Sequence, residues 1–362
     1  MLTDTEEQII RYARDPSNGP RVTVIGGGTG LSTMLRGLKL YTNHLTAIVT
    51  VADNGGSSGM LREDLGMLPP GDIRNCILAL ADTEPLMSDL LNYRFSDGRL
   101  QGQNFGNLLI AAMNAVSGNF YDAVRNVSKV LAVTGRVLPV SLQDIQISAL
   151  LTDQTVIQGE SEIGNRTTIP GNDIEWIRME PSDAVPLQES LEALRQAEVI
   201  VLGPGSLYTS IIPNLLFPSI CDTIVQSKAL KIYVCNIMTQ PAETLNYDAT
   251  RHIQAILRHA GLPTPQGLID TCITNNGPIP QDLADRYSRE QAIPVTADAD
   301  VLQGMGINPV SASLVTTHQG VIRHDHTMLA RVIMQLQLEH DAKARQAAAD
   351  KADRRHAGKR AV

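Results

Sequence analysis

The strongest constraint on this chain is a glycine-rich turn between an aliphatic run and a helical pattern. Residues 21–25 are "RVTVI", and "LSTMLRGLKL" follows a turn made of five small residues, Gly26, Gly27, Gly28, Thr29 and Gly30. Glycines allow positive φ and a close approach of the backbone to a ligand. The free N–H groups and dipole at a helix start favour a bound anion. The turn therefore predicts a strand–turn–helix unit that holds a phosphate, with a purely structural tight turn as the alternative.

Two familiar phosphate motifs do not fit this turn. The P-loop requires a lysine, which the turn lacks. The dinucleotide pattern GxGxxG, begun at Gly26, requires glycine at the position of Leu31, although Asp53 could serve as its later acidic residue. A Walker-type ATPase is therefore excluded, and an NAD-dependent oxidoreductase stays a less favoured alternative.

The pattern of aliphatic runs predicts the fold class. Residues 45–53, "LTAIVTVAD", form a second nearly unbroken apolar strand, as expected in a parallel sheet covered on both faces. Similar strand and helix patterns return at 194–216, 229–238, 268–276 and 321–337. We expect an α/β, Rossmann-like, mainly parallel sheet with helices on both faces. The single domain spans 21–337 and includes a small β-rich insertion at 137–185. A 1–20 extension precedes the domain, and a charged 338–362 tail follows it.

Composition narrows the class of protein. The 362 residues carry a formal net charge of −8, which argues against a nucleic-acid partner. The four cysteines form no CxxC pair, so reduced thiols in a cytoplasmic protein are expected. We find neither a signal peptide nor a stretch of about 18 apolar residues, so we expect no membrane insertion.

A second polar loop follows the strand at 45–53. It offers a carboxylate, an amide, two hydroxyls and flexible backbone, which suit a phosphate or a metal-bridged diphosphate. Two further helix starts carry similar groups, with helix capping as the simpler interpretation. The candidate ligand-binding residues here are Asp53, Asn54, Gly55, Gly56, Ser57, Ser58, Asp72, Asn75, Asn104 and Asn107.

Another strand–turn–helix pattern occupies "VIVLGPGSLYTSIIPNL" at 199–215. Loops at the carboxyl ends of parallel strands converge on one crevice. Several such loops predict a ligand with more than one phosphate, or a phosphate and a sugar. The candidates in this loop are Gly203, Gly205, Ser206, Tyr208, Thr209 and Ser210.

Long segments resemble the bacterial gluconeogenesis factor family, within the 2-phospho-L-lactate transferase superfamily. They include "VIGGGTGLSTMLRGLK", "VTVADNGGSSGMLREDLGMLPPGDIRNCILALAD", "GQNFGNLLIAA", "LGPGSLYTSIIPNLL" and "VCNIMTQPAET". The resemblance runs from about residue 21 to 337. It implies a UDP-sugar ligand, notably UDP-N-acetylglucosamine, and a homodimer. It also implies a cytoplasmic regulatory role in carbon metabolism under gluconeogenic growth, in cell-wall precursor supply and in cell shape.

The resemblance also assigns site residues. It implies that 26–30 and 203–210 meet the diphosphate, and that Tyr287 and Arg323 contact the nucleotide sugar. Without it, a surface ion pair with Asp325 explains Arg323 equally well. The chain departs from many relatives at Asn54, where they have a second aspartate. It also has His326 where some have a phosphorylatable threonine, so regulation there is not implied.

Catalysis is the remaining question. The transferase relatives require a cation on the diphosphate and a positioned acceptor hydroxyl. Asp53 and Asp72 are the candidate catalytic carboxylates, and Asp53 is a candidate Mg²⁺ ligand. We expect a binding protein that requires no cofactor, with an active transferase as the alternative.

Overall fold

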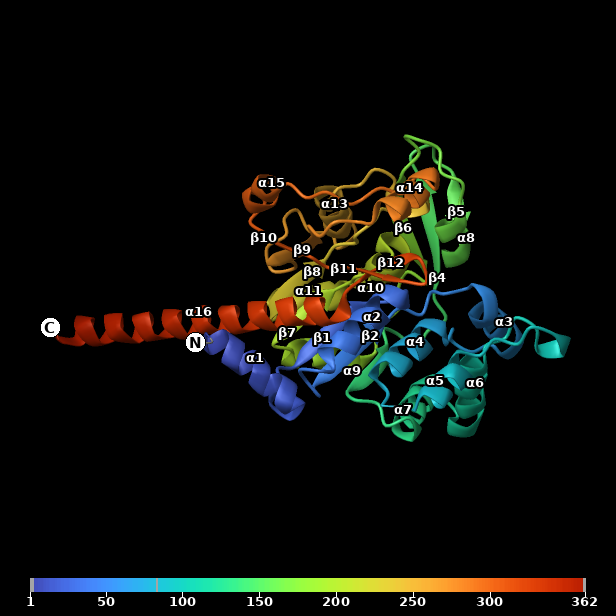
Figure 1. Ribbon diagram of the computed structural model, residues 1–362, viewed down its shortest axis with the longest axis horizontal. Helices are drawn as coiled ribbons and strands as arrows, with labels where there is room; N and C mark the ends of the chain where they lie inside the picture. Colours follow the sequence, from blue (N-terminus) through green and yellow to red (C-terminus); the bar gives the residue numbers. More distant parts are fainter. Residues whose placement is uncertain (1–2, 83, 361–362) are drawn as a thin grey trace.

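The computed structural model describes residues 3–82 and 84–360, without the side chains of 351–360. Its centre is a seven-stranded, all-parallel sheet in the order β10-β9-β8-β7-β1-β2-β3 (Figure 1). The strands are β1 (Val22–Gly26), β2 (Leu45–Val49), β3 (Arg136–Pro139), β7 (Val199–Leu202), β8 (Leu230–Val234), β9 (Thr271–Asn275) and β10 (Asn308–Ala312). The predicted α/β class is confirmed.

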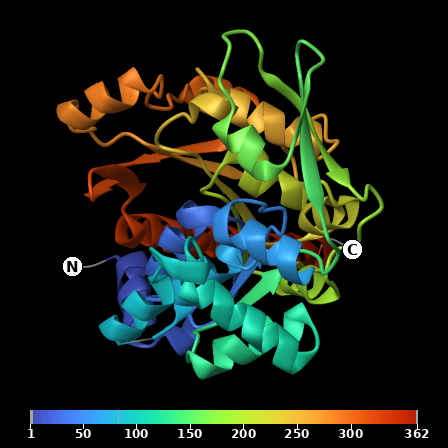
Figure 2. The same cartoon turned by 90° about the vertical axis from the view of Figure 1, so that its right-hand side faces the viewer.

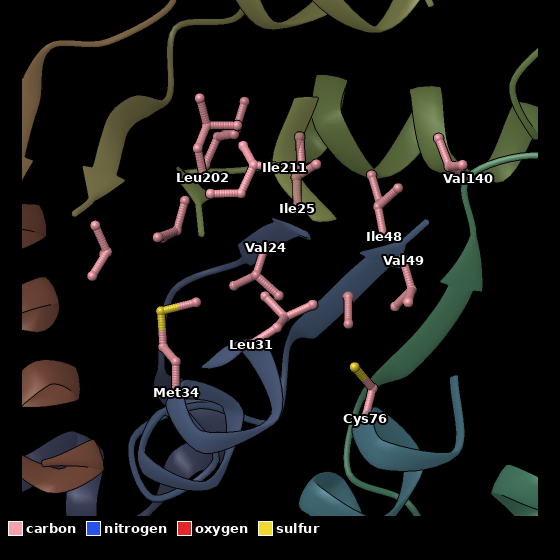
Figure 3. Close-up of a cluster of buried hydrophobic side chains, with 14 of the residues drawn as sticks. Val24, Ile25, Leu31, Met34, Ile48, Val49, Cys76, Val140, Leu202 and Ile211 are labelled. Carbon is pink, nitrogen blue, oxygen red and sulfur yellow. The ribbon is translucent and has the colours of Figure 1, made fainter. Parts of the chain in front are cut away.

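The aliphatic strands are buried because helices cover both faces of the sheet. Successive side chains of β1 point to opposite faces, as the pleat requires. Val24 lies on the side of Leu31 and Met34, whereas Ile25 lies on the side of Ile211 (Figure 3). The unbroken apolar runs of the sequence thus reflect burial on both faces.

Each face of the sheet has its own helices. On one face, α2 (Gly28–Leu38) packs between α4 (Gly71–Leu80) and α16 (His326–Arg360). The other face holds α9 (Gln188–Gln196), the one-turn π-helix η3 (Leu207–Ile211), α10 (Ile212–Leu215), α11 (Pro218–Gln226) and α13 (Ala249–His259). The other helices are α1 (Asp4–Arg14), η1 (Pro16–Asn18), α3 (Gly56–Leu65), α5 (Pro85–Asn92), η2 (Gly98–Leu100), α6 (Phe105–Ser117), α7 (Phe120–Val130), α8 (Glu160–Asn165), α12 (Pro241–Thr244), α14 (Gln281–Arg289) and α15 (Ala299–Gly304).

The β-rich region is smaller than the predicted 137–185 insertion. Residues 137–139 belong to β3, which pairs with β2 at the edge of the main sheet. A separate antiparallel sheet contains β4 (Gln146–Leu151), β5 (Val156–Gln158) and β6 (Ile174–Glu180). Strand propensity alone does not distinguish the two sheets, because both use short β-branched runs.

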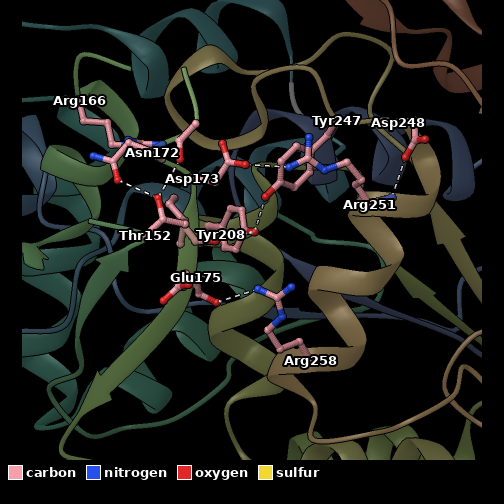
Figure 4. Close-up of polar contacts among 12 residues, drawn as sticks. Thr152, Arg166, Asn172, Asp173, Glu175, Tyr208, Tyr247, Asp248, Arg251 and Arg258 are labelled. Carbon is pink, nitrogen blue, oxygen red and sulfur yellow. Dashed lines mark hydrogen bonds and ion pairs between the residues drawn. The ribbon is translucent and has the colours of Figure 1, made fainter. Parts of the chain in front are cut away.

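Contacts with α13 anchor this small sheet on the main body. Arg251 forms an ion pair with Asp173 at 2.8 Å, and Arg258 donates to the carbonyl of Glu175 (Figure 4). The small sheet and the α5–α7 helices lie at opposite ends of the molecule in both views (Figures 1 and 2).

The strand order creates a switch point between β1 and β7. From β1 the chain moves outward through β2 to β3, and it then returns to the other side of β1 at β7. Ligands of open α/β sheets bind outside the carboxyl ends of the strands at such a point. The loops at 26–30 and 203–210 follow these two strands directly.

The C-terminal region forms one helix. The first turns of α16 bury Leu329, Ile333 and Met334, and α1 packs beside it. Beyond its contacts with the body, α16 continues outward as far as Arg360 (Figure 1). Within the described residues, no helix is both long and apolar enough to cross a bilayer.

Candidate functional site

A cavity of about 370 Å³ opens at the switch point between β1 and β7. Its volume lies within the usual range for small-molecule sites. Nine of the predicted residues line it, namely Gly27, Gly28, Thr29, Gly30, Gly205, Ser206, Ser210, Tyr287 and Arg323. Two loops predicted to bind a diphosphate therefore meet in one hollow.

The glycine turn presents the start of α2 to this cavity. Gly28 has φ +69°, and no side chain caps the helix. A Cβ at Gly30 would lie 2.7 Å from the carbonyl oxygen of Pro204, so the two loops are packed too closely for a side chain there. The helix start has no side-chain cap, and with the neighbouring loop it has the geometry that suits an anion.

The 203–210 loop has two sides. Ser206 and Ser210 line the cavity, whereas Tyr208 and Thr209 point away from it. Glu243 accepts hydrogen bonds from the N–H of Tyr208 and the hydroxyl of Thr209, both at 2.8 Å. The Tyr208 hydroxyl lies 3.0 Å from that of Tyr247 (Figure 4), and neither residue lines the cavity. Tyr208 and Thr209 therefore position the loop, contrary to the prediction that they contact a ligand.

The second polar loop lies next to the cavity without lining it. Ser57 accepts from the N–H of Asn104 and the side chain of Asn107, and Ser58 accepts from the N–H of Gly71. These buried groups connect α3, α4 and α6, so they hold loops together and do not face a ligand. The remaining predicted residues outside the cavity lining are Gly26, Asp53, Asn54, Gly55, Gly56, Asp72, Asn75 and Gly203.

Asn54 has a different structural role from the one expected. Its side chain accepts from the N–H of Ser161 at 2.8 Å and donates to Glu162 at 3.1 Å. It thereby ties the second loop to α8. Asn54 thus serves a contact between the main domain and the helix that lies between β5 and β6 in the chain.

The simpler interpretation, in which Asp72 caps its helix, is wrong. The N-cap of α4 is Pro70, and Asp72 lies in the first turn. Its carboxylate instead packs against Gly27, beside the cavity. Burial and the charge of Asp53 raise the pKa of Asp72 to about 7, although the N–H of Gly28 opposes this shift.

Glu160 is a carboxylate that the sequence gave no reason to select. It begins α8, and burial together with the charges of Asp53 and Asp72 raises its pKa to about 8. Within the described residues, no three His, Cys, Asp or Glu side chains form a metal-binding group. Burial is the larger cause of both raised pKa values, and repulsion by neighbouring carboxylates adds to it.

Tyr287 packs against a small hydrophobic cluster made of Ile237, Met238, Leu283 and Ile322, and Arg323 follows Ile322 in the chain. The hydroxyl of Tyr287 accepts the N–H of Ile322 at 3.2 Å, which links α14 to β12 (Val321–His324). Strand β12 pairs with β11 (Val315–His318). Asp325 accepts the N–H groups of Thr327 and Met328, so it caps α16 and does not pair with Arg323.

Sequence reasoning missed the segment after β8. The cavity is also lined by Thr33, Pro204, Asn236, Ile237, Met238, Thr239, Gln240, Ile322 and His324. A usable signal existed, because 235–243 follows a strand just as the selected loops do. Its polar residues are spaced among apolar ones and were not singled out.

Comparisons with known proteins agree with this geometry. Residues 22–315 match the family model for 2-phospho-L-lactate transferase CofD. The gluconeogenesis factor of Bacillus subtilis is 45% identical over 320 residues, covering 88% of this chain and 98% of the relative. A Thermoanaerobacterium thermosulfurigenes relative, also named as a gluconeogenesis factor, is 55% identical over 88% of this chain and 97% of its own length.

A solved structure shows the same fold. The crystal structure of a Bacillus halodurans protein is 44% identical, with a TM-score of 0.82, and the match covers 88% of this chain and all of that one. The family model spans the glycine turn, the 203–210 loop and Tyr287, and it ends before Arg323. The chain therefore belongs to the gluconeogenesis factor family, within the group described by the 2-phospho-L-lactate transferase model.

Proposed function

We propose that this protein binds a nucleotide sugar of the UDP-N-acetylglucosamine type and acts as a regulator. The supporting observation is the cavity at the switch point, where the uncapped start of α2 meets the hydroxyls of Ser206 and Ser210. Arg323 supplies a cation, and the ring of Tyr287 offers a surface for a base. Neutral amides, hydroxyls and one arginine suit a diphosphate carried by a polar, uncharged sugar.

The names of the relatives extend this proposal to physiology. Two of them are gluconeogenesis factors, which supports a role in carbon metabolism during gluconeogenic growth. The family resemblance adds cell-wall precursor supply, cell shape, a cytoplasmic location and a homodimer to the proposal. Deletion of the gene should then impair growth on gluconeogenic carbon sources.

Calorimetry tests the ligand directly. Titration with UDP-N-acetylglucosamine, UDP-glucose, GDP and NAD compares base, sugar and cofactor classes on the same protein. We expect binding of the UDP-sugars and weaker binding of GDP. Binding of NAD without binding of any UDP-sugar would contradict the proposal and restore the oxidoreductase alternative.

A transferase reaction is the second candidate, favoured by the carboxyls of raised pKa beside the glycine turn. Asp53 and Asp72 would hold Mg²⁺ together with phosphate oxygens, which is the usual protein contribution to a Mg²⁺ site. The bound cation would neutralise charge on the diphosphate, while Glu160 would be available to exchange a proton. Release of UMP or GMP in the presence of Mg²⁺ and a candidate acceptor would establish this activity.

A further inference from the structure

A chain of hydrogen bonds runs from the backbone of Gly205 to the cavity. Asn236 lies beside Gly205, with Oδ1 3.3 Å from the Gly205 nitrogen and Nδ2 2.9 Å from the Gly205 oxygen. Asn236 Nδ2 is also 3.4 Å from Oε1 of Gln240, whose Nε2 is 2.8 Å from Oγ of Ser206. All four residues line the cavity.

The backbone determines the direction of every bond in this chain. The N–H of Gly205 can only donate and its carbonyl can only accept. Only one orientation of the Asn236 side-chain amide therefore forms both hydrogen bonds. Its Nδ2 group must then donate to Gln240, which turns the Gln240 Nε2 group toward Ser206. Because Ser206 Oγ already accepts this bond, its own proton is left to donate.

The Ser206 proton has no protein acceptor among residues 3–82 and 84–360, and Ser206 lines the cavity. A hydroxyl that accepts on one side is a better donor on the other, because hydrogen bonds in a chain polarise one another. The Gly205 N–H, by contrast, is already used by Asn236. At this point of the loop, the donor left for an anion is therefore the Ser206 hydroxyl and not the Gly205 amide.

We propose that Gln240 is a positioning residue that makes Ser206 a dedicated hydrogen-bond donor to a phosphate oxygen of the ligand. This inference rests on the proposed function, since it assigns one contact to the diphosphate. Gln240 itself is held in place as the N-cap of α12, where its N–H donates to Thr244 Oγ1 at 2.9 Å. A fixed donor at Ser206 favours a group that can accept, such as a phosphate oxygen, over a group that can only donate.

The decisive variant is Gln240→Glu, which keeps the shape of the side chain and replaces the Nε2 donor with an acceptor oxygen. A carboxylate cannot donate to Ser206, so it accepts the hydrogen bond of the Ser206 hydroxyl, which is then lost to the ligand. It also places a negative charge beside the diphosphate. We expect UDP to bind at least about tenfold more weakly, and uridine, which lacks phosphate, to bind as it does to the wild type. Gln266→Glu is the matched control, because Gln266 is exposed and lies outside the cavity.

Ser206→Ala completes a double-mutant cycle. If Gln240 acts through Ser206, part of the Gln240→Glu loss disappears in the Ser206→Ala background, and the two losses do not multiply. If the two fold-losses of UDP affinity multiply fully, the Gln240→Glu effect comes only from the introduced negative charge and not through Ser206. Equal UDP affinity in Gln240→Glu and Gln266→Glu would overturn the proposal. A parallel loss of uridine affinity and melting temperature in Gln240→Glu would also overturn it, in favour of a merely structural role.

Pyrophosphate as a second probe separates this inference from the proposed function. If the wild type binds pyrophosphate but neither UDP nor UDP-N-acetylglucosamine, the nucleotide-sugar proposal fails. The Gln240→Glu comparison then proceeds with pyrophosphate and still decides the role of Ser206. Binding of none of these probes by the wild type would overturn both proposals.

Discussion

The carboxylate of Asp72 packs directly against Gly27, where an added Cβ would lie 2.5 Å from Oδ2. This contact joins the first turn of α4 to the turn that begins α2. It places a carboxyl group at the edge of a predicted anion site, so that charge, backbone geometry and ligand binding are coupled at one point.

Gly27→Ala should therefore disrupt the site. The new methyl group would also lie 2.8 Å from Cγ2 of Thr50, so the turn must shift. We expect a loss of stability of about 1–3 kcal/mol, as for other overpacked sites, and a UDP-N-acetylglucosamine affinity reduced at least about tenfold. Urea unfolding and calorimetry measure the two effects.

Gly26→Ala is the control for that variant. Its Cβ would meet only ordinary contacts, 3.5 Å or more from Leu31 and Gly203. Gly26→Ala should lower the free energy of unfolding and the UDP-N-acetylglucosamine affinity less than Gly27→Ala does. Equal effects of the two substitutions would show that the contact with Asp72 does not limit the turn.

The raised pKa values of Asp72 and Glu160 predict a pH dependence of stability. Both carboxyls bind protons more tightly in the folded chain than in the unfolded one, with folded values of about 7 and about 8. The folded state therefore holds more protons between about pH 4 and pH 8, and the free energy of unfolding falls as the pH rises through this window. Denaturant titrations at several pH values measure that slope.

Asp72→Asn and Glu160→Gln should each flatten this slope. At pH 8 each variant should be more stable than the wild type by about 1–3 kcal/mol, since both residues are of intermediate exposure, which reduces the full effect. An unchanged slope in the double variant would assign the pH dependence to other groups.

Arg323→Ala should weaken binding without loosening the fold. The Arg323 side chain is exposed, and its one hydrogen bond to the described part of the chain is a 3.4 Å contact with the carbonyl of Ile322. We expect about tenfold weaker UDP-N-acetylglucosamine binding and an unchanged melting temperature of the free protein. The exposed Arg289 of α14 lies outside the cavity, so Arg289→Ala should leave both values unchanged. A large drop in melting temperature for Arg323→Ala would identify a structural role.

Glu243 should control the shape of the second loop. Its buried carboxylate accepts from Tyr208 and Thr209, and burial raises its pKa. Glu243→Ala leaves both donors unpaired and should destabilise the protein by about 2–4 kcal/mol. Glu243→Gln keeps an acceptor for the N–H of Tyr208, so its free energy of unfolding, measured with urea, should fall less. Equal losses for alanine and glutamine would indicate that the charge, and not the acceptor, matters.

Much of the architecture could be predicted from local pattern. The continuous aliphatic runs at 21–25 and 45–53 indicated strands buried on both faces, and the glycine turn indicated the start of α2. These features are encoded by neighbouring residues, so periodicity and turn chemistry suffice to identify them. The β3 strand was misassigned to the insertion because its pairing with β2 joins residues about 90 positions apart.

The candidate site was only partly predictable for the same reason. Gly27–Gly30, Gly205, Ser206 and Ser210 face the cavity as expected, whereas Thr209 turns toward Glu243 and Ser57 toward Asn107. A loop's composition indicates that polar groups are present. The direction in which each one points depends on partners far away in the sequence.

The sequence by itself determined the parallel α/β class, the glycine-rich turn that begins α2 and the family, because each resides in contiguous residues. Only the tertiary structure decided which polar side chains face the cavity and which hold its walls. It also decided that Asp72 approaches Gly27, that Glu160 approaches Asp53, and that Gln240 donates to Ser206. These relationships arise where separate strands end side by side, and buried polar groups there must find partners across the whole fold.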